Sequence, residues 1–84
     1  MAKYRKKPVV IEAVQWFPGS NLDDVVEKPD RVDPATRKLV PAHGLIKTLE
    51  GWMTVSSGDW VITGVAGEKY PCKDEIFQQT YDPV

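Results

Sequence analysis

The chain has 84 residues, with 11 basic and 12 acidic side chains, a net charge of −1 and one cysteine. This length predicts a single domain, residues 1–84, with only a modest core of its own, so assembly into a homo-oligomer would supply additional burial. The near-zero net charge disfavours a nucleic-acid-binding module, and a single cysteine disfavours a disulfide-rich secreted scaffold and fits a reducing cytoplasm.

Residues 9–17 form the first predicted element, a β-strand rich in β-branched and aromatic residues. Alternation places apolar side chains on both of its faces, which is typical of a central strand or one buried on two sides. The segment before it is basic, but no long apolar run follows it. A signal peptide and a membrane span are therefore not expected.

Residues 18–43 are predicted to form a short helix and then an irregular excursion. Ser20 or Asn21 is a suitable N-cap, and Leu22, Val25 and Val26 follow at helical spacing, so the helix would end near residue 28. Three prolines lie between positions 29 and 41 among mixed charges. Irregular segments of this length are usually functional or mobile.

Residues 44–84 are predicted to form a β-meander with a C-terminal helix. Strands are expected near 45–49, 52–55, 60–63 and 68–71. The sequences EG at 50–51, SSGD at 56–59 and GVAG at 64–67 are typical of the hairpin turns between them. Pro71 cannot donate a main-chain hydrogen bond, so the last strand should end there or lie at a sheet edge.

The C-terminal helix should begin at Asp74 or Glu75 and end at Thr80. Asp74 is a good N-cap, and Glu75 is favourable at a helix N-terminus. A helix this short is marginal in isolation, so Ile76 and Phe77 are expected to dock on the sheet.

The predicted fold class is α+β: a small, mostly antiparallel sheet or partly closed barrel of about five strands, with two short helices. The strand at 9–17 is expected beside one strand of the meander. The helices would cover one face or close one end.

Catalytic chemistry finds little support in the sequence. His43 lies in a turn-like Ala-His-Gly and is interpreted as an exposed loop residue. Lys73 could lower the pKa of the neighbouring Cys72, although a packed or merely tolerated thiol is the preferred interpretation. No paired metal-ligand spacing, phosphate-binding loop or dinucleotide fingerprint is present. We therefore predict a protein that is not an enzyme, with no metal site and no cofactor.

Aromatic residues are abundant for so small a sheet, with three tryptophans and three tyrosines. The simplest interpretation is that they form the core. The alternative is a stacking surface on which basic neighbours contact phosphate groups. The candidate ligand-binding residues on this second interpretation are Tyr4, Arg5, Lys6, Lys7, Trp52, Trp60, Lys69, Tyr70 and Lys73.

Three segments, YRKKPVVIEAVQW, GLIKTLEG and SGDWVITGVAGEKYPCKDEIFQQTY, resemble a family of small accessory proteins of tailed bacteriophages and prophages. That family typically closes with PGDYII-G-GE-YPCKPDIFE-TYE. The chain has Ser57 in place of Pro and Trp60 in place of Tyr, and it lacks the Pro before Asp74. The resemblance covers nearly everything except residues 18–43. It implies a phage product that works in the host bacterial cytoplasm, in a family without a settled activity.

Three function classes follow from these observations. The first is a non-enzymatic counter-defence protein that sequesters a cyclic nucleotide or NAD-derived immune signal at the interfaces of a homo-oligomer. The second is a protein-binding inhibitor of a host or defence enzyme, with residues 18–43 as its contact surface. The third, a nucleic-acid-binding module, is disfavoured by the charge balance.

Overall fold

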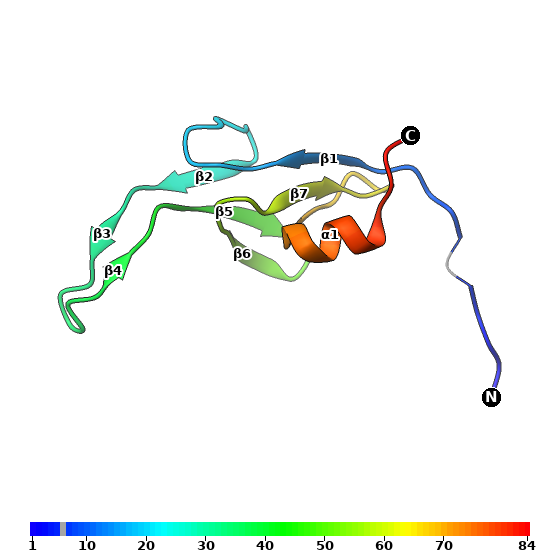
Figure 1. Cartoon of the computed structure of the whole chain (residues 1–84), viewed down its shortest axis with the longest axis horizontal. Helices are drawn as coiled ribbons and strands as arrows, with labels where there is room; N and C mark the ends of the chain where they lie inside the picture. Colours follow the sequence, from blue (N-terminus) through cyan, green and yellow to red (C-terminus); the bar gives the residue numbers. More distant parts are fainter. Residues whose placement is uncertain (6) are drawn as a thin grey trace.

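The computed structural model describes residues 1–5 and 7–84, and it contains eight strands and one helix (Figure 1). The strands form antiparallel sheets of order β1-β7-β8, β2-β5-β6 and β3-β4, none of which closes into a barrel. The elements are β1 Glu12–Gln15, β2 Val25–Lys28, β3 Arg31–Val32, β4 Leu39–Val40, β5 His43–Thr48, β6 Gly51–Val55, β7 Trp60–Thr63, β8 Lys69–Cys72 and α1 Asp74–Thr80. The predicted small, mostly antiparallel α+β architecture is confirmed in outline, with one helix instead of two.

The core lies between the two three-stranded sheets. Trp16, just after β1, is fully buried together with Ile46 of β5 and Val55 of β6. Val25 of β2 and Val61 of β7 complete this cluster. Because alternate residues of a strand point to opposite faces, one face of each sheet supplies these side chains.

The predicted four-strand meander is divided between the two sheets. β5 pairs with β6 and β7 pairs with β8, but β6 and β7 belong to different sheets, and β7 pairs with β1 instead. The turn between β6 and β7 explains the division. The Trp16 amide donates to the Asp59 carbonyl at 2.7 Å, and the Gly58 amide donates to the Trp16 carbonyl at 2.8 Å. Gly58 and Asp59 thus lie opposite the single residue Trp16, as in a β-bulge. This bulge directs β7 toward β1.

The chain turns near all three predicted positions, but the hairpin predicted at 56–59 is wrong, because β6 and β7 do not pair, whereas the one at 64–67 joins the paired strands β7 and β8. Gly58 and Gly67 have φ angles of +91° and +82°, as glycine turn residues often do. The β5–β6 hairpin has two loop residues, Leu49 and Glu50, since Thr48 pairs with Gly51, so the turn lies one residue earlier than predicted. Pro71 lies in β8, an edge strand of its sheet, as expected.

The predicted helix over residues 20–28 is wrong. Val25–Lys28 is strand β2, which pairs antiparallel with β5. Asn21 has a left-handed φ of +55°, and the Glu27 carboxylate accepts hydrogen bonds from the amides of Gly19 and Asn21. Pairing with β5 and burial of Val25 against Ile46 thus prevail over a weak local helical preference.

The segment 29–41 is not an irregular excursion. β3 and β4 form a hairpin that projects from the body of the molecule (Figure 1). The Asp33 carboxylate accepts a hydrogen bond from the Ala35 amide inside its turn. Val32 and Leu39, which pair across the hairpin, are both exposed.

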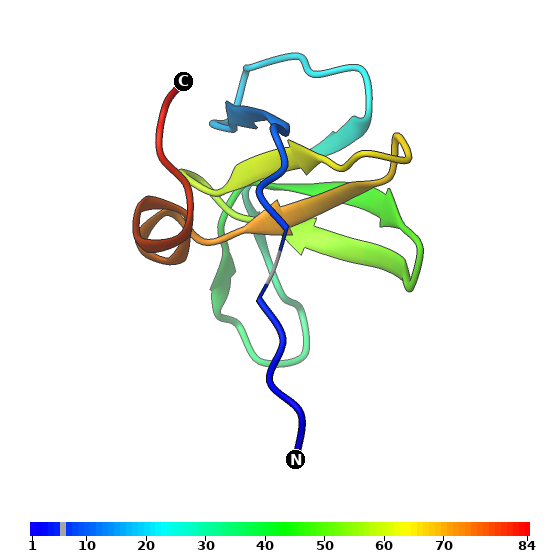
Figure 2. The same cartoon turned by 90° about the vertical axis from the view of Figure 1, so that its right-hand side faces the viewer.

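The strand predicted over residues 9–17 is shorter than expected and is not central. β1 covers Glu12–Gln15 and lies at the edge of its sheet. The residues before it leave the sheet as an extended N-terminal arm, residues 1–5 and 7–11 (Figure 2). Val10 on this arm is 74% exposed and Val14 of β1 is 50% exposed, so neither is buried on two sides.

The C-terminal helix has its predicted bounds but not its predicted details. Lys73, rather than Asp74, is the N-cap residue and makes no side-chain capping hydrogen bond. Ile76 is exposed, so its expected docking on the sheet is wrong. Phe77 does dock: its ring stacks on Trp60 of β7, with 4.1 Å between the centroids and 7° between the planes.

Candidate functional site

The structure brings together only some of the predicted ligand-binding residues. Tyr4 and Arg5 lie exposed on the N-terminal arm, and Lys6 lies outside the described residues. Lys7 and Tyr70 line one cavity. Trp60 and Lys69 lie in the β1-β7-β8 sheet and Lys73 is the N-cap residue of α1, and each has a hydrogen-bond partner within the protein. Trp52, in β6, is exposed.

The cavity that Lys7 and Tyr70 share has a volume of about 400 Å³ and lies between the N-terminal arm, the β7–β8 turn and the end of α1. We name it the arm cavity. Its lining residues are Lys7, Pro8, Val9, Ile11, Gly64, Val65, Glu68, Tyr70, Thr80 and Tyr81. It therefore combines one cationic side chain, one carboxylate and two phenol rings with aliphatic walls.

A second hollow of about 350 Å³ adjoins the arm cavity and shares Val9, Ile11 and Tyr81 with it. We name it the aromatic groove. Trp60 and Phe77 line it, together with residues 82–84 at the C-terminus. Sequence reasoning did not include Phe77 or Tyr81 among the candidate residues. Their spacing of four on a helical segment was the available signal.

Tyr70 and Tyr81 are linked inside the arm cavity by their hydroxyl groups, whose oxygens are 3.5 Å apart. The hydrogen bond with Tyr81, followed by burial, raises the pKa of Tyr70 to about 12. The neutral form of Tyr70 is thus favoured, and the cavity keeps a hydroxyl group that can donate or accept a hydrogen bond.

This pKa shift predicts a loss of stability in alkali. In the unfolded chain Tyr70 should ionise near 10, whereas in the folded protein it stays protonated to about 12. The contribution to stability is therefore complete below pH 10 and disappears as the pH rises through 12. Absorbance at 295 nm should show a titration step near pH 12 that is missing in Tyr70→Phe. Tyr81→Phe should move this step toward pH 10. An unchanged profile in both variants would refute the Tyr70–Tyr81 hydrogen bond.

Lys69 lies beside Tyr70 at a smaller hollow of about 240 Å³, next to the β5–β6 hairpin. Its ammonium group donates to Thr63 Oγ1 at 2.6 Å and forms an ion pair with Asp24 at 3.4 Å. Lys69 therefore joins β7, β8 and the loop before β2. Its charge is less available to a ligand than that of Lys7.

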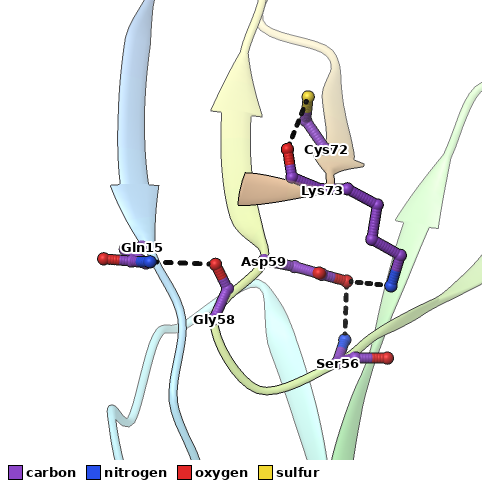
Figure 3. Close-up of polar contacts among 6 residues, drawn as sticks. All are labelled: Gln15, Ser56, Gly58, Asp59, Cys72 and Lys73. Atoms are coloured by element: carbon purple, nitrogen blue, oxygen red, sulfur yellow. Dashed lines mark hydrogen bonds and ion pairs between the residues drawn. The ribbon is translucent and has the colours of Figure 1, made fainter. Parts of the chain in front are cut away.

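Lys73 is likewise occupied by the protein (Figure 3). Its Nζ lies 3.0 Å from Oδ2 of Asp59, which is buried and also accepts a hydrogen bond from the Ser56 amide. Gln15 of β1 donates to the Gly58 carbonyl in the same turn at 3.0 Å. The cluster fixes the turn that separates the two sheets, which is a structural role.

Cys72 is oriented toward the main-chain carbonyl of Lys73, with 3.6 Å between Sγ and the oxygen. Burial and the nearby negative charge of Asp59 raise the pKa of the thiol. The alternative that Lys73 lowers this pKa is therefore wrong. Lys73 pairs with Asp59, and an elevated pKa disfavours the reactive thiolate.

The three tryptophans have three different environments. Trp16 is buried in the core. Trp60 is partly buried, with one ring face covered by Phe77 and its Nε1 donating to Asp74 Oδ1 at 2.8 Å, which lowers the pKa of Asp74. Trp52 is 59% exposed on the outer face of its sheet, with Lys47 Nζ 5.6 Å from the ring centroid. Trp52 lines neither the arm cavity, nor the aromatic groove, nor the hollow beside Lys69.

Within residues 1–5 and 7–84, His43, the potential metal ligands and the length of α1 give three further findings. His43 is the first residue of β5 and is partly buried, with Nδ1 2.9 Å from the Pro41 carbonyl oxygen, so it is not the exposed loop residue expected. No group of three or more potential metal ligands gathers in this part of the chain. Its helix α1 has seven residues, far fewer than the roughly 20 that a membrane span requires.

Comparison with known proteins adds nothing to this geometry, since no family model, curated protein or solved structure matches the chain.

Proposed function

We propose that this protein is a non-enzymatic phage accessory protein that sequesters a nucleotide-type immune signal, and that the arm cavity is where the signal binds. The observation that supports this most is the convergence of Lys7, Tyr70 and Tyr81 on one hollow of about 400 Å³. Two of the three were candidates from sequence. The resemblance to phage proteins supports a counter-defence role in the host cytoplasm.

The chemistry of the arm cavity fits a nucleotide in three respects. Ligand sites are commonly hollows of roughly 300–1,000 Å³ with mainly apolar walls and a few polar groups. The Lys7 ammonium would attract phosphate oxygens, and the phenol rings of Tyr70 and Tyr81 would stack on a base. The adjoining aromatic groove would extend the stacking surface to Trp60 and Phe77.

The N-terminal arm that lines the cavity also carries Lys3 and Arg5, which are exposed. A second copy of the chain that covers the cavity would bury the ligand and exclude water. A protein that holds a small polar molecule without converting it needs such enclosure. We therefore propose that the protein acts as a homo-oligomer.

A thermal-shift screen against cyclic di- and trinucleotides, cyclic ADP-ribose isomers and NAD tests this function. A ligand present at 100 times its Kd adds about 2.7 kcal/mol of stability, which corresponds to a Tm increase on the order of 10 °C for a domain of this size. Lys7→Ala should reduce the shift strongly, whereas Lys38→Ala, an exposed lysine remote from the cavity in sequence, should not. No shift with any compound, or equal shifts in both variants, would refute the arm cavity as the site.

A second candidate, a protein-binding inhibitor of a host or defence enzyme, is favoured by the projecting β3–β4 hairpin. Val32 and Leu39 lie at paired positions there, exposed to solvent and flanked by Arg31, Lys38 and Val40. Exposed apolar side chains on a projecting element are suited to a partner protein. Absence of any small-molecule shift would make this hairpin the leading candidate surface.

A further inference from the structure

We propose that two copies of this chain pair antiparallel through the open edge of β1, so that their sheets join in the order β8-β7-β1-β1-β7-β8. This interface specifies the homo-oligomer that the proposed function includes. It is argued from the sheet edge, however, and does not depend on any ligand.

The main-chain groups of β1 point alternately toward β7 and away from it. Trp16 exchanges hydrogen bonds with Gly58 and Asp59, on the β7 side. Since main-chain groups alternate along a strand, Ala13 and Gln15 direct their N–H and C=O groups away from β7. Within the described chain β1 is the last strand of its sheet, and the loop that follows it and the C-terminal tail lie toward its two ends (Figure 1). Such an edge is a template for another strand.

The chain that leads into β1 has the composition of a strand. Val9, Val10 and Ile11 have strong β-strand preference but have no strand partner among the described residues. Val9 and Val10 are exposed, as is Val14. A second copy would pair these residues and cover their side chains, which explains why a sequence typical of a buried strand is left open in the single chain.

Charge restricts how β1 of one copy can be aligned with β1 of the other. A two-fold axis through Glu12 would set two carboxylates directly opposite each other, which is destabilising. The outward-directed residues are the odd-numbered ones, and an axis at Ile11 or Ala13 makes one of them a hydrogen-bonded pair at the centre of the interface. Glu12 then faces Val10 or Val14 of the second copy.

Charge distribution favours the same arrangement. In an antiparallel pair, the N-terminal arm of one copy runs alongside the residues that follow β1 in the other. The arm carries Lys3, Arg5 and Lys7, and the loop after β1 carries the exposed Asp23 beside Asp24, which pairs with Lys69 of its own chain. Opposite charges would therefore meet at both ends of the interface, as two-fold symmetry requires.

The dimensions of the single chain also indicate a missing partner. Its accessible surface is 6842 Å², against about 5,000 Å² expected for a folded monomer of 9.4 kDa. Its radius of gyration is 15.4 Å, against about 12 Å for a compact domain of 84 residues. The arm and the β3–β4 hairpin account for the extended shape, and edge pairing would cover the arm.

Analytical ultracentrifugation of two proline variants tests the interface. Ala13→Pro removes a donor that faces the open edge, which an edge strand tolerates, whereas Val14→Pro removes a donor that faces β7. We expect a dimer for the wild type at about 100 μM, a folded monomer for Ala13→Pro with its dissociation constant raised at least tenfold, and loss of the β-sheet circular dichroism for Val14→Pro. A monomeric wild type, or a folded Ala13→Pro that remains dimeric, would overturn the proposal.

Cysteine cross-linking tests the register even if Ala13→Pro fails to fold. Residues at the axis have Cα atoms about 5.5 Å apart, within reach of a disulfide. In a Cys72→Ser background, either Ile11→Cys or Ala13→Cys should give covalent dimers on mild oxidation, well above Val65→Cys in the exposed β7–β8 turn. Yields no higher than that control for both positions would refute the edge pairing. A dimer that binds no ligand would retain this inference and refute the proposed function. A monomer that binds ligand would refute this inference and the enclosure by a second copy, but would retain the arm cavity as the ligand site.

Discussion

Trp16→Ala should unfold the protein or leave it close to unfolding at 25 °C. The side chain is fully buried between the two sheets, where it contacts the cluster of Val25, Ile46, Val55 and Val61. Truncation of a buried tryptophan costs about 3–5 kcal/mol, because the residual cavity adds to the lost burial. A small domain has about 5–15 kcal/mol of stability in total, so little would remain.

Urea unfolding followed by far-ultraviolet circular dichroism measures this effect. Trp52→Ala is the matched control, because it removes the same side chain from an exposed site and should change the free energy of unfolding by only about 0.5 kcal/mol. Trp16→Phe should lie between them, since it keeps most of the ring volume and removes an indole Nε1 that has no hydrogen-bond partner in the described chain. Equal losses at Trp16 and Trp52 would refute the placement of the core.

Gly44→Ala should lower the free energy of unfolding by about 1–3 kcal/mol. Gly44 lies in β5 on the inner face of its sheet, beside the Trp16 ring. A β-carbon at this position would collide with Cγ1 of Val25, a branched side chain in a buried strand. The backbone needs no unusual φ angle here, so the lack of space, rather than conformational freedom, is what requires glycine.

A double-mutant cycle separates the collision from other causes. Val25→Ala alone should destabilise through a cavity, but combined with Gly44→Ala it should cost clearly less than the sum of the two single changes. Chemical denaturation of the four proteins gives the coupling energy. Strict additivity would mean that the added methyl group does not meet Val25, contrary to the packing described.

Much of the local structure was predictable from the sequence because it depends on neighbouring residues. The glycines of the three turns allow backbone conformations that other residues avoid, and Pro71 restricts β8 to an edge. The bounds of α1 follow from acidic residues at its start and Pro83 after its end. These signals involve a few residues in sequence and need no distant partner.

The candidate site was predictable only in part. Lys7 and Tyr70 were identified as residue types able to bind a nucleotide, but Trp52 and Lys73 share the same chemistry and lie elsewhere. Chemistry alone cannot separate them, because a cavity is made by side chains distant in sequence. Tyr81 became part of the arm cavity only because α1 returns its end to the sheet.

Tertiary structure alone decided three further features. Val25 and Val26 are compatible with helix or strand, and only pairing with β5 makes residues 25–28 strand β2. The turn at 56–59 has the composition of a hairpin turn. Because Gly58 and Asp59 form hydrogen bonds with Trp16, however, β7 pairs with β1 in the other sheet. Residues 9–11 have the sequence of a strand without a strand partner in their own chain. In each case a hydrogen-bonding partner far along the chain, or in the proposed second copy, supplies what the local sequence leaves undetermined.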